Sequence, residues 1–207
     1  MTLQTILDSR IIAIVRLAQY DAAVDVARAL RDGGIRAVEF TLTGGGANEA
    51  IARCRAALPE LAIGVGTVLR ADAAREAIDA GAQFVVTPTL RPDVIALCSA
   101  HGIPIACGAL TPSEALMAHE LGAELVKIFP ARALGPSYIA DMLAPLPMLR
   151  LVPTGGIGAA NARAYLAAGA VAVGVGGSLV SADAVAERRW DAITAQARAL
   201  VDAIGGG

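Results

Sequence analysis

Residues 112–130 read PSEALMAHELGAELVKIFP, and this stretch decides the predicted fold. Its first part, residues 112–121, has a helical pattern that ends at Gly122, because glycine commonly follows the last turn of a helix. Residues 124–129 then form a short apolar run, which predicts a buried strand. The stretch therefore predicts one helix followed at once by one strand.

The same alternation continues in both directions along the chain. Short apolar runs predict eight strands, at residues 11–16, 37–42, 62–68, 84–87, 104–108, 124–129, 149–153 and 171–175. Helical patterns predict helices at residues 21–32, 48–58, 72–80, 92–100, 112–121, 137–143, 160–168 and 191–204. Apolar strands that alternate with helices indicate a parallel sheet buried on both faces.

This many strand-helix units in 207 residues predict a single (β/α)8 TIM barrel over residues 1–207, with residues 205–207 as a flexible tail. The main alternative is an open, doubly wound sheet, which typically carries a glycine-rich nucleotide loop after its first strand. Here Arg16-Leu17-Ala18-Gln19 follows the first strand, and the chain has no P-loop motif. The barrel is therefore the favoured fold.

Composition argues against several classes of protein. A formal net charge of −2 and 3% aromatic residues do not favour nucleic-acid binding. The chain is 56% hydrophobic, but its apolar runs are interrupted before the length of about 20 residues that crosses a membrane. Residues 1–9 lack the basic and apolar segments of a signal peptide.

The cysteines and histidines predict no metal site and no disulfide framework. Cys54, Cys98 and Cys107 are odd in number and scattered, which is typical of reduced thiols in a cytoplasmic protein. His101 and His119 form no metal-binding spacing with a cysteine, so both are expected to be structural or exposed. The sequence therefore predicts no metal.

Lys127 is the only lysine among 17 basic residues, and it lies in an apolar strand. Arginine cannot replace lysine in imine chemistry, because guanidinium stays protonated and is a poor nucleophile. A desolvated lysine loses its proton more readily and can attack a carbonyl to form a Schiff base. The alternative is a lysine at a strand end whose ammonium reaches solvent.

Polar residues at the carboxyl ends of the strands are the candidate site residues, because barrel active sites lie at that end. Glu39 projects from an apolar strand, either as an ion-pair partner of Lys127 or as an acid/base for imine chemistry. Alternation along the strands predicts three sets that each share the inward face: Ile12, Ile14 and Arg16; Ile63, Val65 and Thr67; Leu125, Lys127 and Phe129.

Two glycine-bearing strand ends complete the candidate site. Residues 153–157, PTGGI, and 175–178, VGGS, close the seventh and eighth strands, where barrels usually bind phosphate through backbone N–H groups. The alternative is that these glycines only permit tight turns. Arg16 could bind a carboxylate with two hydrogen bonds or form a structural salt bridge.

The chain resembles the 2-keto-3-deoxy-6-phosphogluconate (KDPG) aldolase family, which includes 4-hydroxy-2-oxoglutarate and 2-keto-3-deoxy-6-phosphogalactonate aldolases. The segments that carry the resemblance appear in family order: Ile14-Val15-Arg16, Val38-Glu39-Phe40-Thr41-Leu42, Gly64-Val65-Gly66-Thr67-Val68-Leu69, Val86-Thr87-Pro88, Lys127-Ile128-Phe129-Pro130, Gly135-Pro136-Ser137-Tyr138-Ile139, Pro153-Thr154-Gly155-Gly156 and Gly174-Val175-Gly176-Gly177-Ser178.

The resemblance implies a class I aldolase without metal or cofactor, usually a homotrimer, that cleaves KDPG to pyruvate and D-glyceraldehyde 3-phosphate in the Entner–Doudoroff pathway. Lys127 would be the Schiff-base lysine and Glu39 the acid/base that acts through water. The implied substrate-binding residues are Thr67, Pro88, Phe129 and Thr154 near the reacting carbons, and Gly155, Gly156, Gly176, Gly177 and Ser178 at the phosphate.

One departure from the family pattern changes an assignment. Many members carry an arginine four residues after the glutamate, where Thr43 stands here. Another branch uses an arginine at the end of the first strand, so the carboxylate of the 2-keto acid substrate is assigned to Arg16.

Alternative functions remain open from the sequence. The same chemistry could act on 2-keto-3-deoxy-6-phosphogalactonate or on 4-hydroxy-2-oxoglutarate. A phosphosugar isomerase or epimerase would use a similar barrel without an imine, and a non-catalytic barrel could serve as an assembly scaffold.

Overall fold

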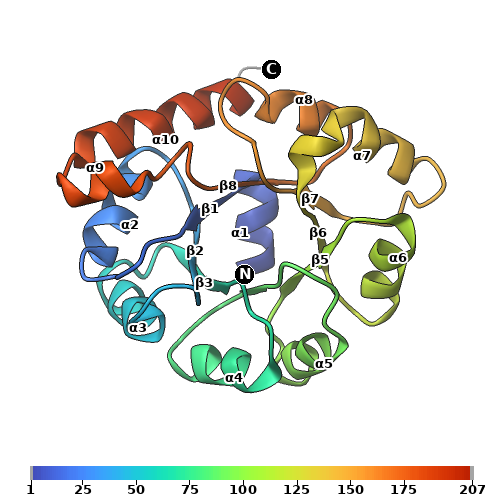
Figure 1. Ribbon diagram of the computed structural model, residues 1–207, viewed down its shortest axis with the longest axis horizontal. Helices are drawn as coiled ribbons and strands as arrows, with labels where there is room; N and C mark the ends of the chain where they lie inside the picture. The colour runs from blue at the N-terminus through green and yellow to red at the C-terminus, as the bar shows by residue number, and fades with distance from the viewer. Residues whose placement is uncertain (1, 206–207) are drawn as a thin grey trace.

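A computed structural model describes residues 2–205, in which eight parallel strands lie inside a ring of helices (Figure 1). The strands are β1 (Ile11–Val15), β2 (Ala37–Thr41), β3 (Ala62–Gly66), β4 (Val85–Val86), β5 (Ile105–Ala109), β6 (Leu125–Ile128), β7 (Leu151–Pro153) and β8 (Val173–Val175). The helices are α1 (Thr2–Ser9), α2 (Ala23–Asp32), α3 (Ala47–Ala57), α4 (Ala71–Asp79), α5 (Pro92–His101), α6 (Pro112–Glu120), the 3-10 turn η1 (Ala131–Ala133), α7 (Gly135–Leu143), α8 (Ala162–Ala167), α9 (Ala182–Ala186) and α10 (Trp190–Gly205).

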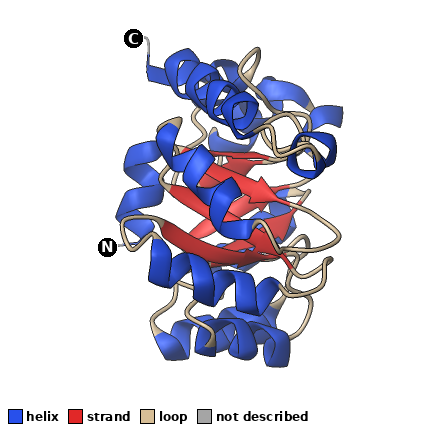
Figure 2. Ribbon diagram, turned by 90° about the vertical axis from the view of Figure 1, so that its left-hand side faces the viewer, coloured by secondary structure: helices blue, strands red, loops and turns tan. Residues whose placement is uncertain are grey.

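The strand order confirms the predicted TIM barrel and excludes the doubly wound sheet. Hydrogen-bonded neighbours follow the order β7-β6-β5-β4-β3-β2-β1-β8, and every pair is parallel. A parallel bridge between Thr154 and Gly174 joins the two outer strands and closes the barrel. Figure 2 shows the strands enclosed by helices, with their arrowheads pointing away from the marked N-terminus.

The end of the barrel where the strands begin is filled by apolar side chains that face the axis. Ile12, Phe84 and Leu125 belong to this cluster, and each is at most 1% exposed. Gly64 lies beside it, and a Cβ at this position would come within 2.5 Å of the Phe84 ring. Glycine at position 64 therefore lets one large ring occupy the centre of the barrel.

Two helices were not predicted from the sequence. Helix α1 closes the barrel floor, because its fully buried Ile6 joins the axial cluster and Leu3 and Leu7 pack against it. These three residues have the spacing of one helical face, which was the available signal. Helix α9 has only five residues, too few to show a period.

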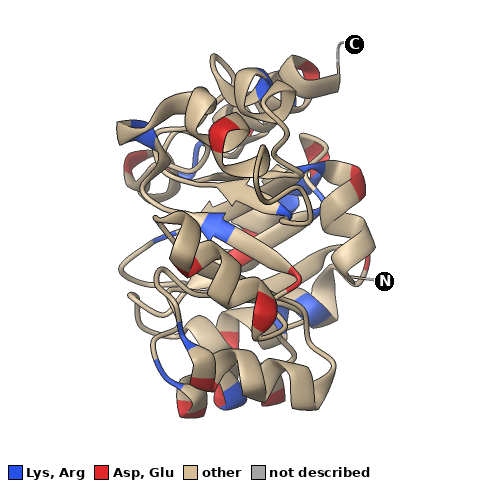
Figure 3. Cartoon of the chain, turned by 90° about the vertical axis from the view of Figure 1, so that its right-hand side faces the viewer, with Lys and Arg blue, Asp and Glu red and all other residues tan. Residues whose placement is uncertain are grey.

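The outer surface and the chain ends complete the description. Charged residues of both signs are spread over the outer helices (Figure 3). Within residues 2–205, no helix is both long and apolar enough to span a membrane. Of the expected tail, Gly205 ends α10, while residues 206–207 lie outside the described residues.

Candidate active site

Lys127 points into the barrel because it follows the inward-facing Leu125 by two residues on β6. It is 4% exposed, and its Nζ lies 5.3 Å from the centre of the Phe129 ring. Burial lowers the pKa of the ammonium, and the charge of Arg16 adds to this, while Glu39 opposes it. The environment therefore favours the neutral amine, which is the nucleophilic form.

Glu39 enters the same interior from β2, two residues after the inward-facing Ala37. It is 1% exposed, and its buried Oε1 accepts no hydrogen bond from the described residues. Burial raises the pKa of this carboxyl group, whereas the charges of Lys127 and Arg16 oppose that rise. The environment therefore favours a protonated carboxyl group that can donate a proton.

Glu39 and Lys127 each shift the pKa of the other without forming an ion pair. No ion pair joins them in the part of the chain that the structure describes. The structural ion pair with Lys127, which was the alternative role for Glu39, is therefore not formed. A buried acceptor atom without a partner instead marks a place for a water molecule or a substrate hydroxyl.

Arg16 and Thr67, two of the predicted site residues, meet at the rim of the barrel. The Arg16 guanidinium donates a hydrogen bond to Thr67 Oγ1 at 3.4 Å. The predicted face of β3 was wrong, however, because Ile63 and Val65 pack outward against the helices. Thr67 reaches Arg16 because its φ of +58° turns the chain just after the strand and breaks the alternation.

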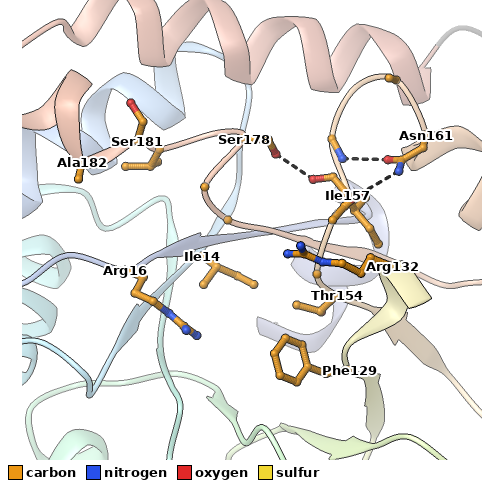
Figure 4. A pocket seen from close by; sticks show the side chains of 17 residues that line it. Ile14, Arg16, Phe129, Arg132, Thr154, Ile157, Asn161, Ser178, Ser181 and Ala182 are labelled. Carbon is orange, nitrogen blue, oxygen red and sulfur yellow. Dashed lines mark hydrogen bonds between the residues drawn. The ribbon is translucent and has the colours of Figure 1, made fainter. Parts of the chain in front are cut away.

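A cavity of about 680 Å³ opens at this end of the barrel (Figure 4). It is lined by predicted residues, namely Arg16, Phe129, Thr154, Gly155, Gly156, Gly176, Gly177 and Ser178. Lys127, Glu39, Thr67 and Pro88 are not among its lining residues. Lys127 is connected to it through Phe129, whose ring lines the cavity and lies beside Nζ.

Pro88 lies beside the strand that neighbours Lys127. Gly108 of β5 pairs with Lys127 in the barrel register. A Cβ at Gly108 would lie 2.5 Å from the carbonyl oxygen of Pro88. The close approach fixes the backbone after β4 next to β5, the strand that neighbours the lysine strand β6, although Pro88 does not line the cavity.

Side-chain hydrogen bonds hold the two glycine loops in shape. Ser178 Oγ donates to the carbonyl oxygen of Ile157 at 2.8 Å, so it ties the loop after β8 to the loop after β7. Asn161 accepts a hydrogen bond from Gly158 N and donates one to Gly156 O, both at 2.9 Å. Because Ser178 donates its hydroxyl proton to Ile157, this proton is already engaged in a hydrogen bond within the protein.

Among the polar lining residues, Arg132, Asn161 and Ser181 were not predicted from the sequence. All three lie beyond the strand ends, where the barrel rule gives no signal. The available signal for Arg132 was its place in the loop that follows the lysine strand.

For metals, no group of three or more His, Cys, Asp or Glu side chains suited to hold an ion occurs within residues 2–205.

The fold and the site together define a class: a (β/α)8 barrel whose interior lysine can form an imine with a carbonyl compound. Comparison with known proteins agrees. Residues 3–196 match the model of the family described as KDPG and KHG aldolase. The chain therefore belongs to the KDPG and KHG aldolase family, and it is a class I aldolase, a lyase.

Individual relatives span nearly the whole chain. The 2-dehydro-3-deoxy-phosphogluconate aldolase of Treponema pallidum (strain Nichols) is 40% identical over 197 residues, 95% of this chain and 94% of the relative. The 2-dehydro-3-deoxy-6-phosphogalactonate aldolase of Escherichia coli (strain K12) is 33% identical over 196 residues, covering 94% and 96%.

A solved structure supports the chemistry as well as the fold. KDPG aldolase from Legionella pneumophila, with pyruvate captured at low pH as a covalent carbinolamine intermediate, has a TM-score of 0.90 and 27% identity. The match covers 97% of this chain and 98% of that one. A barrel of the same shape thus binds pyruvate covalently.

The close packing of Glu39 against Gly66 gives a first prediction. A Cβ at Gly66 would overlap Glu39 Oε1 and come within 2.7 Å of its Cδ. Gly66→Ala should therefore displace the carboxyl group and lower kcat about 100-fold or more, the range of general acid–base effects. Steady-state aldol cleavage measures this.

A double-mutant cycle in the free energy of unfolding tests whether the Gly66→Ala effect acts through Glu39. Gly66→Ala should cost about 1–3 kcal/mol in the wild type, as overpacking does, and much less in a Glu39→Ala background. An equal cost in both backgrounds would show that the methyl group strains something other than Glu39.

The raised pKa of Glu39 predicts a pH-dependent difference in stability. In the folded protein the carboxyl group keeps its proton above the ordinary value of 4.5, whereas the unfolded chain releases it. The stability that Glu39 contributes is thus full below pH 4.5 and is lost as pH rises through the folded pKa. Glu39→Gln should lose less stability than the wild type over this rise. Urea denaturation at several pH values tests it, and parallel stability curves would contradict it.

Proposed function

We propose that the chain reversibly cleaves 2-keto-3-deoxy-6-phosphogluconate to pyruvate and D-glyceraldehyde 3-phosphate. The observation that carries the proposal is the interior pair of Lys127, with its pKa lowered, and Glu39, with its pKa raised. The phosphogluconate aldolase of Treponema pallidum, at 40% identity, supports this substrate. An isomerase would need no imine and would leave Lys127 without use, and a scaffold would use neither buried group.

Lys127 begins the reaction. Its neutral Nζ adds to the C2 carbonyl of the substrate, and loss of water from the carbinolamine gives an iminium ion. Glu39, acting through a water molecule, first gives its proton to the departing carbinolamine hydroxyl, and the resulting carboxylate then accepts the proton of the C4 hydroxyl. The C3–C4 bond then breaks, its electron pair moves into the iminium to form an enamine, and the aldehyde leaves. Protonation at C3 and hydrolysis release pyruvate and restore the amine.

The remaining residues bind the substrate along the barrel mouth. Arg16, with Thr67, binds the carboxylate next to C2, because guanidinium and carboxylate match in charge and shape. Phe129, Thr154 and Pro88 line the carbon chain. The phosphate lies over two backbone loops, formed by Gly155 and Gly156 and by Gly176, Gly177 and Ser178.

Two related substrates are the alternatives. The galactonate epimer is supported by the 33% identity with the Escherichia coli phosphogalactonate aldolase and by the segment 135–139. The unphosphorylated 4-hydroxy-2-oxoglutarate is the other. Parallel steady-state assays with all three substrates rank them by kcat/KM.

We also propose a setting for this activity. The chain is one barrel domain that forms a homotrimer in the cytoplasm and acts in the Entner–Doudoroff pathway. The family resemblance supports the trimer, and so do exposed apolar side chains such as Met117 and Leu121 on and after α6. Three buried free cysteines support a reducing compartment.

Borohydride trapping tests the imine. With pyruvate, reduction should leave a pyruvyl adduct on the peptide that contains Lys127, because this is the only lysine side chain. Lys127→Arg should give no such adduct and should lower kcat by about 10⁴-fold or more. Peptide mass mapping separates Lys127 from the terminal amine. A folded wild type without an adduct on Lys127 would contradict the mechanism.

Substitution of Arg16 tests the carboxylate assignment. Arg16→Ala should raise KM for the 2-keto acid about 10- to 100-fold, because it removes charge-assisted hydrogen bonds. Arg16→Lys keeps the charge without the fork and should recover part of the loss. An unchanged KM in Arg16→Ala would remove this role from Arg16.

A further inference from the structure

Arg132 reaches the cavity from η1, the turn that follows the lysine strand. Its side chain runs across Gly156, where a Cβ would lie 2.6 Å from Arg132 Cβ and 3.5 Å from its Nε. Gly156 also has a φ of +76°, which other residues rarely adopt. Glycine at position 156 thus leaves the space through which the arginine side chain passes.

The guanidinium of Arg132 is directed into the cavity rather than toward another protein group. Figure 4 shows it pointing toward the middle of the cavity, with Arg16 on the opposite side. Arg70 and Arg91 each form an ion pair with a nearby aspartate. The Arg132 guanidinium, by contrast, forms no hydrogen bond or ion pair with any other side chain between residues 2 and 205.

The electrostatics of the cavity favour an anion beside Arg132. Its lining contains two cations, Arg16 and Arg132, and no aspartate or glutamate from the described residues. Next to it, the backbone N–H groups of Gly177 and Ser178 donate to no acceptor within residues 2–205. A guanidinium fork and free backbone donors together suit the oxygens of a phosphate monoester.

The distribution of the two arginines fits a substrate with an anion at each end. Arg16 lies near the interior lysine, as its effect on the Lys127 pKa shows. Arg132 lies at the glycine loops on the other side of the cavity. A carboxylate at one arginine leaves the distal end of the carbon chain at the other.

We infer that Arg132 is a specificity-determining residue that binds the terminal phosphate of the substrate, so that phosphorylated 2-keto-3-deoxy acids are preferred over unphosphorylated ones. The inference rests on the proposed function and adds a side-chain cation to a phosphate site otherwise made of backbone. Arg132 acts by binding and takes no part in proton transfer.

Kinetic discrimination is the first test. We compare kcat/KM for 2-keto-3-deoxy-6-phosphogluconate and for unphosphorylated 2-keto-3-deoxygluconate in the wild type, Arg132→Gln and Arg132→Lys. The ratio of the two values should fall about 10- to 100-fold in Arg132→Gln and by less in Arg132→Lys. Arg150→Gln is the matched control, because Arg150 is an exposed arginine just before β7, at the opposite end of the barrel. It should leave the ratio unchanged.

Equal losses on both substrates, or an unchanged ratio, would overturn the inference. Equal losses would mean that Arg132 shapes the loop rather than binding phosphate. An unchanged ratio would mean that its guanidinium is merely solvated.

A binding measurement separates this inference from the proposed function. Glycerol 3-phosphate and glycerol serve as probes in calorimetry, since neither contains a carbonyl group or a carboxylate. Glycerol 3-phosphate should bind the wild type and Arg150→Gln, and about 10-fold or more weakly to Arg132→Gln. If the wild type neither turns over the sugar acids nor traps pyruvate, the proposed function fails, yet this difference still supports phosphate binding by Arg132. Equal binding by Arg132→Gln and the wild type would overturn it.

Discussion

A closed parallel barrel must fill its own interior, because alternate side chains of every strand point at the axis. Here apolar groups, including Phe84 and Leu125, fill the half of the barrel where the strands begin. Glu39 and Lys127 lie in the half where the strands end. Bulk water does not reach two groups so deeply buried, and they form no ion pair with each other. Desolvation therefore moves their pKa values in opposite directions, toward the neutral amine and the neutral acid. Their reactivity follows from the architecture.

The depth of each charged group suits its task. Lys127 and Glu39 lie in the interior, where charge is unfavourable, which suits the nucleophile and the acid/base that we propose for them. Arg16 and Arg132 lie at the exposed mouth, where guanidinium keeps its charge and can bind anions. The buried lysine can thus become a neutral nucleophile, whereas the exposed arginines remain cations. The glycines at 66 and 156 provide the space in which one member of each group lies.

The sequence predicted the barrel well, because strand and helix periods and glycine helix stops are local signals. It also placed Lys127, Glu39 and Arg16 in the site, since strand ends converge in this fold. The prediction failed where a residue's position depends on an irregular backbone turn or on contacts between separate loops. The face of Ile63 and Val65 was wrong because the positive φ of Thr67 is not visible in an alternation pattern. Arg132 was missed because its place depends on how a loop crosses Gly156, which only the folded structure shows.

Helix α1 gives the barrel a blind end. Ile6 and the axial cluster close the floor, so reactants pass through the mouth formed by the βα loops. Lys127 is buried beside Phe129, whose ring lines the cavity, and the glycine loops line the cavity at the mouth. A substrate bound covalently to the interior lysine would therefore release the fragment nearer the mouth first. The fragment held by Lys127 would follow through the same opening once hydrolysis frees it.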